Sequence, residues 1–338
     1  MTSTVDAVRG HVVESRHRVS IAVVSSDGAL VARSGDPGLV TFWRSAAKLF
    51  QAIPLVSDGA ADALGVDDEE LALACASHNG EARHVEVARR FLGRSGSNEG
   101  DLVCGPHASL SEPVARAMAE RGEKPTRAHS NCSGKHSGML ALARFHGWEK
   151  SGYALPDHPV QRRCLAEVAA WTGLGESQIS LATDGCGVPS FALPIRSMAL
   201  AFARLSVVAA GEEGAPASNG SSAAARRIVA AVRADPFLIA GTGRLDTELL
   251  EAGGGRILAK VGAEGVYSAA LTEQRLGVAI KVEDGDMRCL APALLAVLDQ
   301  LAPGAAPVSE SHREPPIRNS VGAVVGRLVA AVTLERVT

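Results

Sequence analysis

Runs of β-branched and apolar residues stand near both ends of this 338-residue chain, and helical patterns fill the sequence between them. Residues 19–26 form a β-branched run that Asp27-Gly28 closes and residues 29–33 resume, which predicts a β-hairpin. Towards the other end, 265–271 and 276–282 are extended runs, and 317–334 holds a further strand. This order predicts an α/β (α+β) fold class, with an antiparallel sheet formed by the N- and C-terminal strands and covered by helices.

The segments between these strands show helical periodicity. They cover residues 45–56, 68–76, 82–92, 112–121, 137–146 and 159–172. Residues 211–222 and 303–316 are rich in Gly, Ala, Ser or Pro, and we expect both to be exposed loops. Neither separates halves of different composition. We therefore expect a single domain over 1–338, with a helical region of about 45–240 inserted between the N-terminal hairpin and the C-terminal strands.

The amino-acid composition argues against several classes of protein. The net charge is −3 and 46% of residues are hydrophobic, a balance that gives no electrostatic argument for binding nucleic acid or an anionic membrane. The first residues lack the basic and apolar regions of a secretory signal, and no apolar run approaches the ~20 residues of a membrane span. Six widely spaced cysteines without a C-x-x-C pair are expected to be reduced thiols, and the expected compartment is the cytoplasm.

Three short motifs follow one another along the chain: Ser45-Ala46-Ala47-Lys48, Ser77-His78-Asn79 and Lys260-Val261-Gly262. They are written S-x-x-K, S-x-N and K-x-G, which is the order in penicillin-recognising serine hydrolases. Only six lysines occur in the chain, and two of them stand in these motifs. Arginine cannot lose its proton, whereas a buried lysine can and so can act as a base. The motifs therefore predict an activated serine.

Each motif alone also has a simpler interpretation. Ser45 could cap a helix, because serine is a favoured N-cap residue. Residues 77–80 could form a polar turn of the Asn-Gly kind, and Lys260 could be a solvated lysine at a strand end. Together, however, the motifs offer two serine–lysine pairs, Ser45 with Lys48 and Ser77 with Lys260.

Two further segments concentrate polar residues, glycine and cysteine. One is 129–138, with the sequence HSNCSGKHSG, directly before an apolar run that predicts a helix; the other is 183–189, TDGCGVP. A thiol at a helix N-terminus has a depressed pKa, which favours thiolate and metal binding. The residues alone allow a zinc ion held by Cys132 and Cys186 with His129 or His136. They equally allow two small buried thiols, the usual fate of cysteine.

Several longer strings resemble one family. The chain is similar to the Rhizobium etli-type L-asparaginases, the asparaginase II class related to the serine β-lactamases and glutaminases rather than to the threonine-nucleophile bacterial asparaginases. The similarity extends from the first hairpin to the last strand. The strings that carry it are 43–48 (WRSAAK), 76–81 (ASHNGE), 104–107 (CGPH), 129–138 and 184–189 (DGCGVP).

The resemblance implies a serine β-lactamase/glutaminase-like fold, a homodimer, and hydrolysis of L-asparagine to L-aspartate and ammonia. It implies that Ser45, Lys48, Ser77 and Lys260 are the two catalytic serine–lysine pairs. It also implies a Zn²⁺ ion beside the catalytic serine. By motif match, the residues that would hold this zinc are Cys132, Lys135 and Cys186.

We expect Ser45, activated by Lys48, to attack the side-chain amide of asparagine, while Ser77 and Lys260 relay protons. Candidates for contacts to the substrate, directly or through a neighbour, are Arg44, Asn79, His136 and Asp184. Two other classes of function use the same features. One is a glutaminase or another serine amidase or β-lactam-type hydrolase, and the other is a non-enzymatic zinc-binding sensor of amides on the same scaffold.

Overall fold

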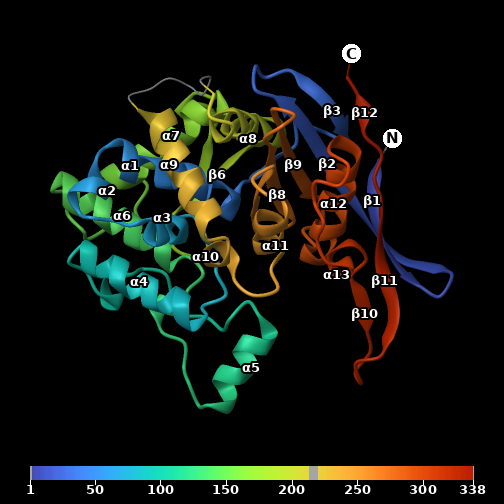
Figure 1. The fold of residues 1–338 in the computed structure, drawn as a ribbon, viewed down its shortest axis with the longest axis horizontal. Helices are drawn as coiled ribbons and strands as arrows, with labels where there is room; N and C mark the ends of the chain where they lie inside the picture. Colours follow the sequence, from blue (N-terminus) through green and yellow to red (C-terminus); the bar gives the residue numbers. More distant parts are fainter. Residues whose placement is uncertain (1, 213–219, 338) are drawn as a thin grey trace. The chain divides into compact units, whose positions relative to one another are not determined.

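The computed structural model describes residues 2–212 and 220–337, which group into two compact units. Unit 1 comprises residues 1–46, 193–212 and 248–338, and unit 2 comprises 47–192 and 213–247. Figure 1 labels strands of the sheet of unit 1 and helices of unit 2, coloured by their position in the sequence. The expectation of one domain over 1–338 stays a prediction. Part of the loop predicted at 211–222 lies outside the described residues.

Unit 1 is built on an antiparallel sheet. Its main path runs β10-β11-β1-β2-β9-β8-β7, and β3 pairs with both β2 and β12. These strands are β1 (Ser3–Arg9), β2 (Val12–Ser25), β3 (Leu30–Ser34), β7 (Ile257–Val261), β8 (Val266–Leu271), β9 (Leu276–Val282), β10 (Pro316–Arg318), β11 (Val324–Ala331) and β12 (Glu335–Arg336). Strand β1 pairs with β11 and β2 pairs with β9, so the two ends of the chain complete one sheet. This confirms a mixed α/β fold with an antiparallel sheet.

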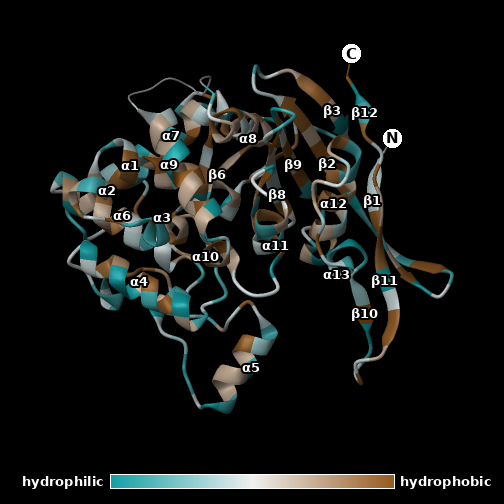
Figure 2. Ribbon diagram, in the orientation of Figure 1, coloured by the Kyte–Doolittle hydropathy of each residue, from teal (hydrophilic) through white to brown (hydrophobic). Residues whose placement is uncertain are grey.

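Two helices of unit 1 pack on this sheet. Helix α8 (Ile195–Ala209) contacts β2, β8 and β9, and α12 (Leu290–Leu301) contacts β11 and β9. Gly277 of β9 allows α8 to approach closely, because a Cβ atom there would lie 1.9 Å from the carbonyl oxygen of Ala199. Figure 2 shows that β9 and the later residues of β2 are hydrophobic. The core of unit 1 therefore lies between these strands and their helices.

The other elements of unit 1 are short. Strand β4 (Val40–Phe42) precedes the 3₁₀ helix η1 (Arg44–Ala47), whose last residue begins unit 2. The 3₁₀ helix η5 (Met287–Cys289) leads into α12, and α13 (Glu310–Arg313) follows it. Helix α13 falls inside the stretch 303–316 that we expected to be a loop. Helix α11 (Leu245–Ala252) has its first residues in unit 2 and its remaining residues in unit 1.

Unit 2 is mainly helical. Its helices are α1 (Lys48–Ser57), α2 (Ala60–Ala63), α3 (Asp68–Ala74), α4 (Ala82–Arg94), α5 (Glu112–Glu120), α6 (Ser133–His146), α7 (Pro159–Thr172), α9 (Ser221–Ala234) and α10 (Phe237–Ala240). Strand β5 (Ser180–Thr183) pairs antiparallel with β6 (Pro189–Pro194). Helix α1 packs against α6, α7 and α9, and α3 packs against α6 and α9. These contacts place the start of α1, the end of α3 and the start of α6 in one region of unit 2.

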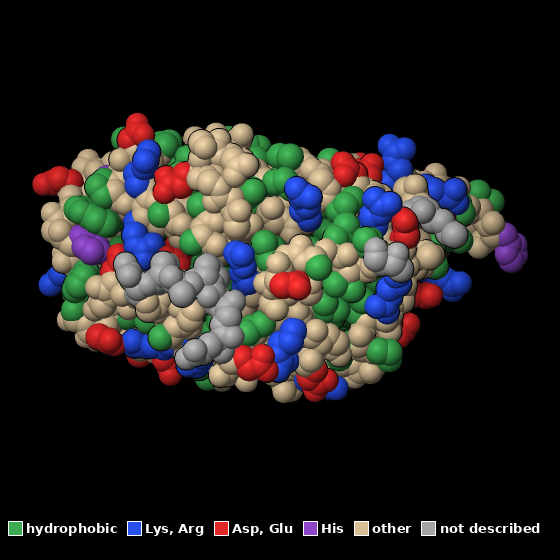
Figure 3. All heavy atoms as spheres, turned by 90° about the horizontal axis from the view of Figure 1, so that it is seen from above, with side chains coloured by type: hydrophobic (Ala, Val, Ile, Leu, Met, Phe, Trp, Pro, Cys, Tyr) green, Lys and Arg blue, Asp and Glu red, His purple; other side chains and the backbone are tan. Residues whose placement is uncertain are grey.

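The surface carries mixed charge. Figure 3 shows side chains of both signs interspersed over the face in view, as the net charge of −3 leads us to expect. Among the residues that the structure describes, no helix combines the length and the apolar character that a membrane crossing requires.

Candidate active site

Lys48 is the first residue of α1, and its side chain is buried with 1% exposure. Its Nζ atom lies 2.5 Å from the carbonyl oxygen of Ala76, 3.2 Å from that of Asn131 and 3.1 Å from Oγ of Ser77. All four residues belong to unit 2. The structure therefore places Lys48 beside Ser77, a contact that the sequence-based pairing of Ser77 with Lys260 did not include.

The loop that follows α3 is held by backbone hydrogen bonds. The Ser77 N–H donates to the carbonyl of Ile239 and the Asn79 N–H donates to that of Ala240, both over 2.8 Å. The Asn79 side chain donates to Glu81 and to the carbonyl of Thr242, and its Oδ1 accepts from Arg244 over 2.9 Å. These bonds engage the Asn79 amide in fixing the loop. Its role as a substrate contact stays a prediction.

His78 connects this loop to α6. Its Nδ1 accepts from the Gly80 N–H over 3.1 Å, so its Nε2–H donates to Oγ of Ser133, 3.0 Å away. Burial lowers the pKa of His78 well below its ordinary value, with His84 and Lys48 adding to the effect. A neutral imidazole is what this hydrogen-bond pattern requires. His78 thus ties the Ser77 loop to the first turn of α6.

The first turn of α6 carries two of the predicted zinc ligands. Cys132 is the N-cap residue of the helix, and Lys135 lies in its first turn. Gly134 allows this turn to pack against α3, because a Cβ atom there would lie 2.1 Å from the carbonyl oxygen of Leu73. The helix begins at Ser133, four residues before the predicted start at 137. The polar run is therefore the buried first turn of the helix rather than a loop before it.

The third predicted ligand lies on the turn between β5 and β6. In this turn the Gly187 N–H donates to the carbonyl of Asp184 over 2.9 Å, and Gly187 has a positive φ of 92°. The turn directs Cys186 towards α6, where the Lys135 Nζ lies 2.9 Å from the Cys186 Sγ. Oδ2 of Asp184 lies 3.7 Å from the same sulfur. The structure therefore brings Cys132, Lys135, Cys186 and Asp184 together within unit 2.

The charges of this cluster depend on one another. A hydrogen bond from Cys186 and the nearby charges of Lys48 and Lys135 hold the pKa of Cys132 well below its ordinary value, against the effect of burial. Burial lowers the pKa of Lys135, but Cys132 and Cys186 outweigh it and raise that pKa. Two thiols and one amine at this separation are a donor set of the kind that zinc prefers. A bound dication would lower the pKa of Lys135 and release its lone pair.

His136 points away from the thiols. The hydroxyl of Tyr153 accepts a hydrogen bond from the Val103 N–H over 3.1 Å and lies 2.7 Å from Nδ1 of His136, to which we assign its own proton because this nitrogen can accept it. The proton of the neutral ring is then on Nε2, and burial lowers the pKa of His136 well below its ordinary value. Among the described residues, Nε2 is buried and has no hydrogen-bond partner. It is a donor that a bound molecule could satisfy.

The remaining predicted residues lie in unit 1. Ser45 and Arg44 are in η1; Ser45 is half-buried, and Arg44 has a left-handed φ of 54°. A residue other than glycine in that region is strained, and such strain is concentrated at functional sites. Lys260 lies in β7 with 1% exposure, and its Nζ donates to the carbonyl of Val261 over 3.1 Å. The pairings of Ser45 with Lys48 and of Ser77 with Lys260 each join a residue of unit 1 to one of unit 2, and both stay predictions.

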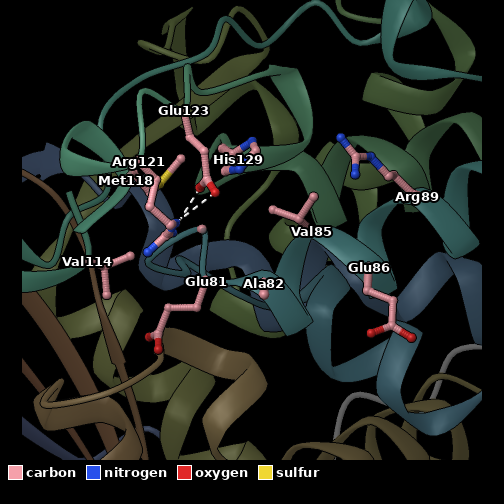
Figure 4. A pocket seen from close by; sticks show the side chains of 11 residues that line it. Glu81, Ala82, Val85, Glu86, Arg89, Val114, Met118, Arg121, Glu123 and His129 are labelled. Atoms are coloured by element: carbon pink, nitrogen blue, oxygen red, sulfur yellow. Dashed lines mark hydrogen bonds and ion pairs between the residues drawn. The ribbon is translucent and has the colours of Figure 1, made fainter. Parts of the chain in front are cut away.

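A hollow of about 420 Å³ in unit 2 begins where the Ser77 loop ends. Figure 4 shows Val85 of α4 and Val114 and Met118 of α5 among its lining residues. Its charged groups are largely engaged with protein partners, since Arg121 pairs with Glu123 and Arg89 with Glu99. Of the residues considered for the site, His129 lines it, whereas the two serine–lysine pairs and Cys132, Lys135 and Cys186 do not. We therefore do not take this hollow as the active site.

Sequence reasoning missed two residues that hold the site together. Tyr153 fixes the proton of His136, and Arg244 holds Asn79. Both are single residues outside every motif, and they reach the site only through the fold. Of the two histidines proposed as zinc ligands from the residues alone, His129 accepts from the Thr126 N–H at Nδ1 over 3.0 Å.

The chain is similar to one protein family and to solved structures of Mglu. Residues 5–330 match the family model of L-asparaginase II. The solved structure of Mglu is 18% identical over 84% of this chain and 66% of the Mglu chain, with a TM-score of 0.37. Mglu in its glutamate form is 17% identical over 86% of this chain and 62% of that one, with a TM-score of 0.39. This chain thus spans less than two thirds of the length of those chains. No curated protein matches the sequence significantly.

Proposed function

Because the chain belongs to the L-asparaginase II family, we propose that it hydrolyses L-asparagine to L-aspartate and ammonia, as the Rhizobium etli-type enzymes do. Family membership supports an amidohydrolase acting on a small molecule. The observation that carries the proposed chemistry is the environment of Lys48, whose amine meets two carbonyl oxygens and the hydroxyl of Ser77.

The partners of Lys48 suit a base. A neutral amine has two hydrogens and one lone pair, and carbonyl oxygens can only accept. The carbonyls of Ala76 and Asn131 therefore take the two hydrogens, which leaves the lone pair to face Oγ of Ser77. In that state Lys48 can receive a proton from a serine hydroxyl. A lone pair of Lys48 that faces Oγ of Ser77 can exchange a proton with that hydroxyl, which supports Ser77 as a proton relay next to the base.

We assign the first attack to Ser45. It is half-buried, whereas Ser77 is 3% exposed, and a nucleophile has to be reached by its substrate. The strained backbone of Arg44 precedes it directly. Ser45 adds to the side-chain amide carbon as its proton passes to Lys48, and the amide nitrogen takes a proton and leaves as ammonia. Water then cleaves the serine ester and frees aspartate, with Ser77 and Lys260 relaying the protons.

We propose that Cys132, Lys135 and Cys186 hold a zinc ion. The three side chains are buried, and Nζ of Lys135 is 2.9 Å from Sγ of Cys186. Three protein ligands leave the fourth tetrahedral position open. When bound, zinc would supply a fixed positive charge that organises the site and attracts substrate oxygen atoms. The lysine must be neutral to coordinate, and a dication can lower its pKa enough.

We propose that the substrate is held by groups that match its own charges. An amino acid carries a carboxylate and an ammonium, which suit a guanidinium such as Arg44 and a carboxylate such as Asp184. The buried Nε2–H of His136 suits an oxygen atom of the substrate. Asn79, predicted as a further contact, would act by holding the Ser77 loop.

Other serine amidases could use the same residues, so the substrate needs a direct assay. We expect ammonia release from L-asparagine to exceed that from L-glutamine under the same conditions; the opposite order would favour a glutaminase. Hydrolysis of a β-lactam in preference to both amino acids would favour a β-lactam-type hydrolase. A folded protein inactive on all of these would favour the zinc-binding sensor.

The nucleophile is tested by trapping. An asparagine analogue that acylates slowly is expected to leave its acyl group on the peptide that contains Ser45, located by mass spectrometry. Ser45→Ala should lose activity, while Ser26→Ala, in the turn between β2 and β3, should not. An acyl group on Ser77, with full activity retained in Ser45→Ala, would reverse the roles of the two serines. The homodimer remains an expectation from the resemblance, and light scattering tests it. The cytoplasmic location remains an expectation from the cysteine pattern and the first residues of the sequence.

A further inference from the structure

A second cluster of metal-ligating side chains lies in unit 1, apart from every residue of the proposed hydrolase. It consists of His17 in β2 with Asp286 and Cys289 at η5, and Asp284, in the turn after β9, adjoins it through His17. The ligand atoms of His17, Asp286 and Cys289 all lie within 4.8 Å of one another. His17 and Cys289 are buried, with 8% and 0% exposure. Three kinds of donor atom, nitrogen, oxygen and sulfur, therefore converge on one point.

The two carboxylates are oriented by the backbone. Oδ1 of Asp284 accepts from the Asp286 N–H over 3.0 Å, and Oδ1 of Asp286 accepts from the Arg288 N–H over 2.9 Å. In each case the other oxygen faces Nδ1 of His17, at 2.7 Å for Asp284 and 3.9 Å for Asp286. Both oxygens are thus aimed at the imidazole before any ion is bound.

The imidazole is oriented as well. Nε2 of His17 lies 3.0 Å from Oγ of Ser15, so the ring is held at one nitrogen while the other faces the carboxylates. Metal-ligating histidines typically donate their second ring N–H to such a partner, which fixes the ring and the tautomer. In the structure Nδ1 of His17 donates to the Asp284 carboxylate over 2.7 Å. A bound ion would take the place of that proton, and with the remaining proton on Nε2 the lone pair of Nδ1 would be directed into the cluster.

We propose that His17, Asp286 and Cys289, with Asp284 as the fourth ligand, bind a divalent transition-metal ion of the Zn²⁺ class. A mixed set of imidazole, carboxylate and thiolate suits such an ion and does not suit Mg²⁺ or Ca²⁺, which prefer oxygen ligands alone. Four ligands of this kind match a closed tetrahedral site, which is the form of a structural zinc site. The ion would connect β2 to the segment between β9 and α12.

An ion can reach the cluster from solvent. The side chain of Asp284 is 50% exposed, and it lines an open hollow together with Arg16, Arg18 and Glu283. The two arginines do not oppose the ion strongly, because Arg16 pairs with Asp6 and Arg18 with Glu283. Arg288 pairs with Asp286, and the ion would have to displace it in part.

The simpler interpretation is an ion pair of His17 with Asp284 and another of Arg288 with Asp286. That interpretation accounts for the contacts of the carboxylates but gives Cys289 no part in the cluster. The two interpretations differ in one measurable respect: only a metal site predicts a bond between the ion and the Cys289 sulfur. This site lies wholly in unit 1 and does not depend on the proposed hydrolase.

The test is titration of the full chain with Co²⁺, which gives a near-ultraviolet charge-transfer band when a thiolate binds it, and measurement of Zn²⁺ bound per chain. We expect Cys289→Ser to bind one equivalent fewer than the parent and to lose the corresponding part of the band. Asp284→Asn, an isosteric change at a half-exposed side chain, should weaken that equivalent about tenfold or more. Cys164→Ser, which removes another buried thiol, is the matched control and should keep the parent stoichiometry.

Two outcomes would overturn the proposal. One is an unchanged stoichiometry and band in folded Cys289→Ser. The other is an Asp284→Asn protein that binds each equivalent as tightly as the parent does. The readout is the difference of one metal equivalent between the parent and the variant, so the result holds whether or not the proposed site at Cys132 and Cys186 also binds metal. If Cys289→Ser does not fold, the metal affinity of Asp284→Asn decides between the two interpretations.

Discussion

The packing of α6 on α3 makes Gly134 the most constrained position of the candidate site. A Cβ atom added there would lie 2.1 Å from the carbonyl oxygen of Leu73 and 2.6 Å from its carbonyl carbon. Optimal contacts between heavy atoms are about 3.5 Å, so the two helices would have to separate by roughly 1 Å. Neither atom belongs to a flexible side chain, so a rotamer change cannot relieve the clash.

We therefore expect Gly134→Ala to destabilise unit 2 and to disturb the site. Overpacking of this kind costs about 1–3 kcal/mol, and a rigid backbone places it at the upper end. The helix propensity of alanine returns about 1 kcal/mol, which leaves a net loss of about 2 kcal/mol and a midpoint lower by roughly 4–8 °C. The same separation moves Cys132 and Lys135 relative to Ser77, and a shift of about 1 Å can cost ~10²-fold in rate.

Gly138, one turn further along α6, provides the matched control. A Cβ atom there would meet Phe91, Ala74 and Leu55 at 3.6–3.7 Å, which is ordinary van der Waals contact. Gly138→Ala should therefore be neutral or stabilise by about 0.5–1 kcal/mol. Thermal unfolding followed by circular dichroism, together with ammonia release, compares the two variants. Equal stability and equal activity of Gly134→Ala and Gly138→Ala would refute the reasoning.

Three further predictions test the charges of unit 2 and its proposed chemistry. Lys48→Arg introduces a cation that cannot take a proton, so kcat should fall by about 10²-fold or more with the fold retained, whereas Lys281→Arg should leave kcat unchanged. Burial lowers the pKa of His84 to about 4, below that of a histidine in the unfolded chain. The unfolded chain therefore binds more protons as pH falls from 7 to 5, and this group should lower the free energy of unfolding by about 2 kcal/mol. Urea unfolding at the two pH values measures this drop, which should be smaller in His84→Asn. Removing zinc with a chelator should raise KM for L-asparagine more than it lowers kcat, and complete loss of turnover in folded, zinc-free protein would contradict the role that we propose for the ion.

The regular elements could be predicted where local chemistry determines them. The hairpin of β2 and β3 and the strands β8 and β9 were predicted, because β-branched runs end at turn residues such as Gly28, whose φ is 95°. Helix α7 has the predicted bounds, since Pro159 begins it and Gly173 with a φ of 72° ends it. Strand β1 was missed, because one of its buried positions is the polar Ser3 and its apolar alternation in the sequence is therefore short.

The site could be predicted in its residues but not in its contacts. The helix was predicted to begin at 137, after the polar run, yet α6 begins at Ser133 and its polar groups are satisfied inside the protein: Ser133 accepts from His78, and Ser137 donates to the carbonyl of Ser133 over 2.9 Å. Lys48 and Ser77 stand 29 residues apart in the sequence, and their contact depends on how α1 and α3 pack. Lys135 entered the predicted zinc site through the resemblance alone, since a charged lysine is no metal ligand.

The scarcity of lysine does not by itself identify the catalytic residues, because Lys281 is buried as well, with 9% exposure. Lys281 donates to the carbonyl of Glu264 and lies near the carboxylates of Glu264, Glu283 and Asp284. Those negative groups favour the ammonium form, although burial lowers its pKa. Lys48 instead meets two carbonyls and one hydroxyl, and only a hydroxyl can return a proton to the amine. The kind of partner, rather than burial, therefore separates a lysine that can act as a base from one that holds the fold.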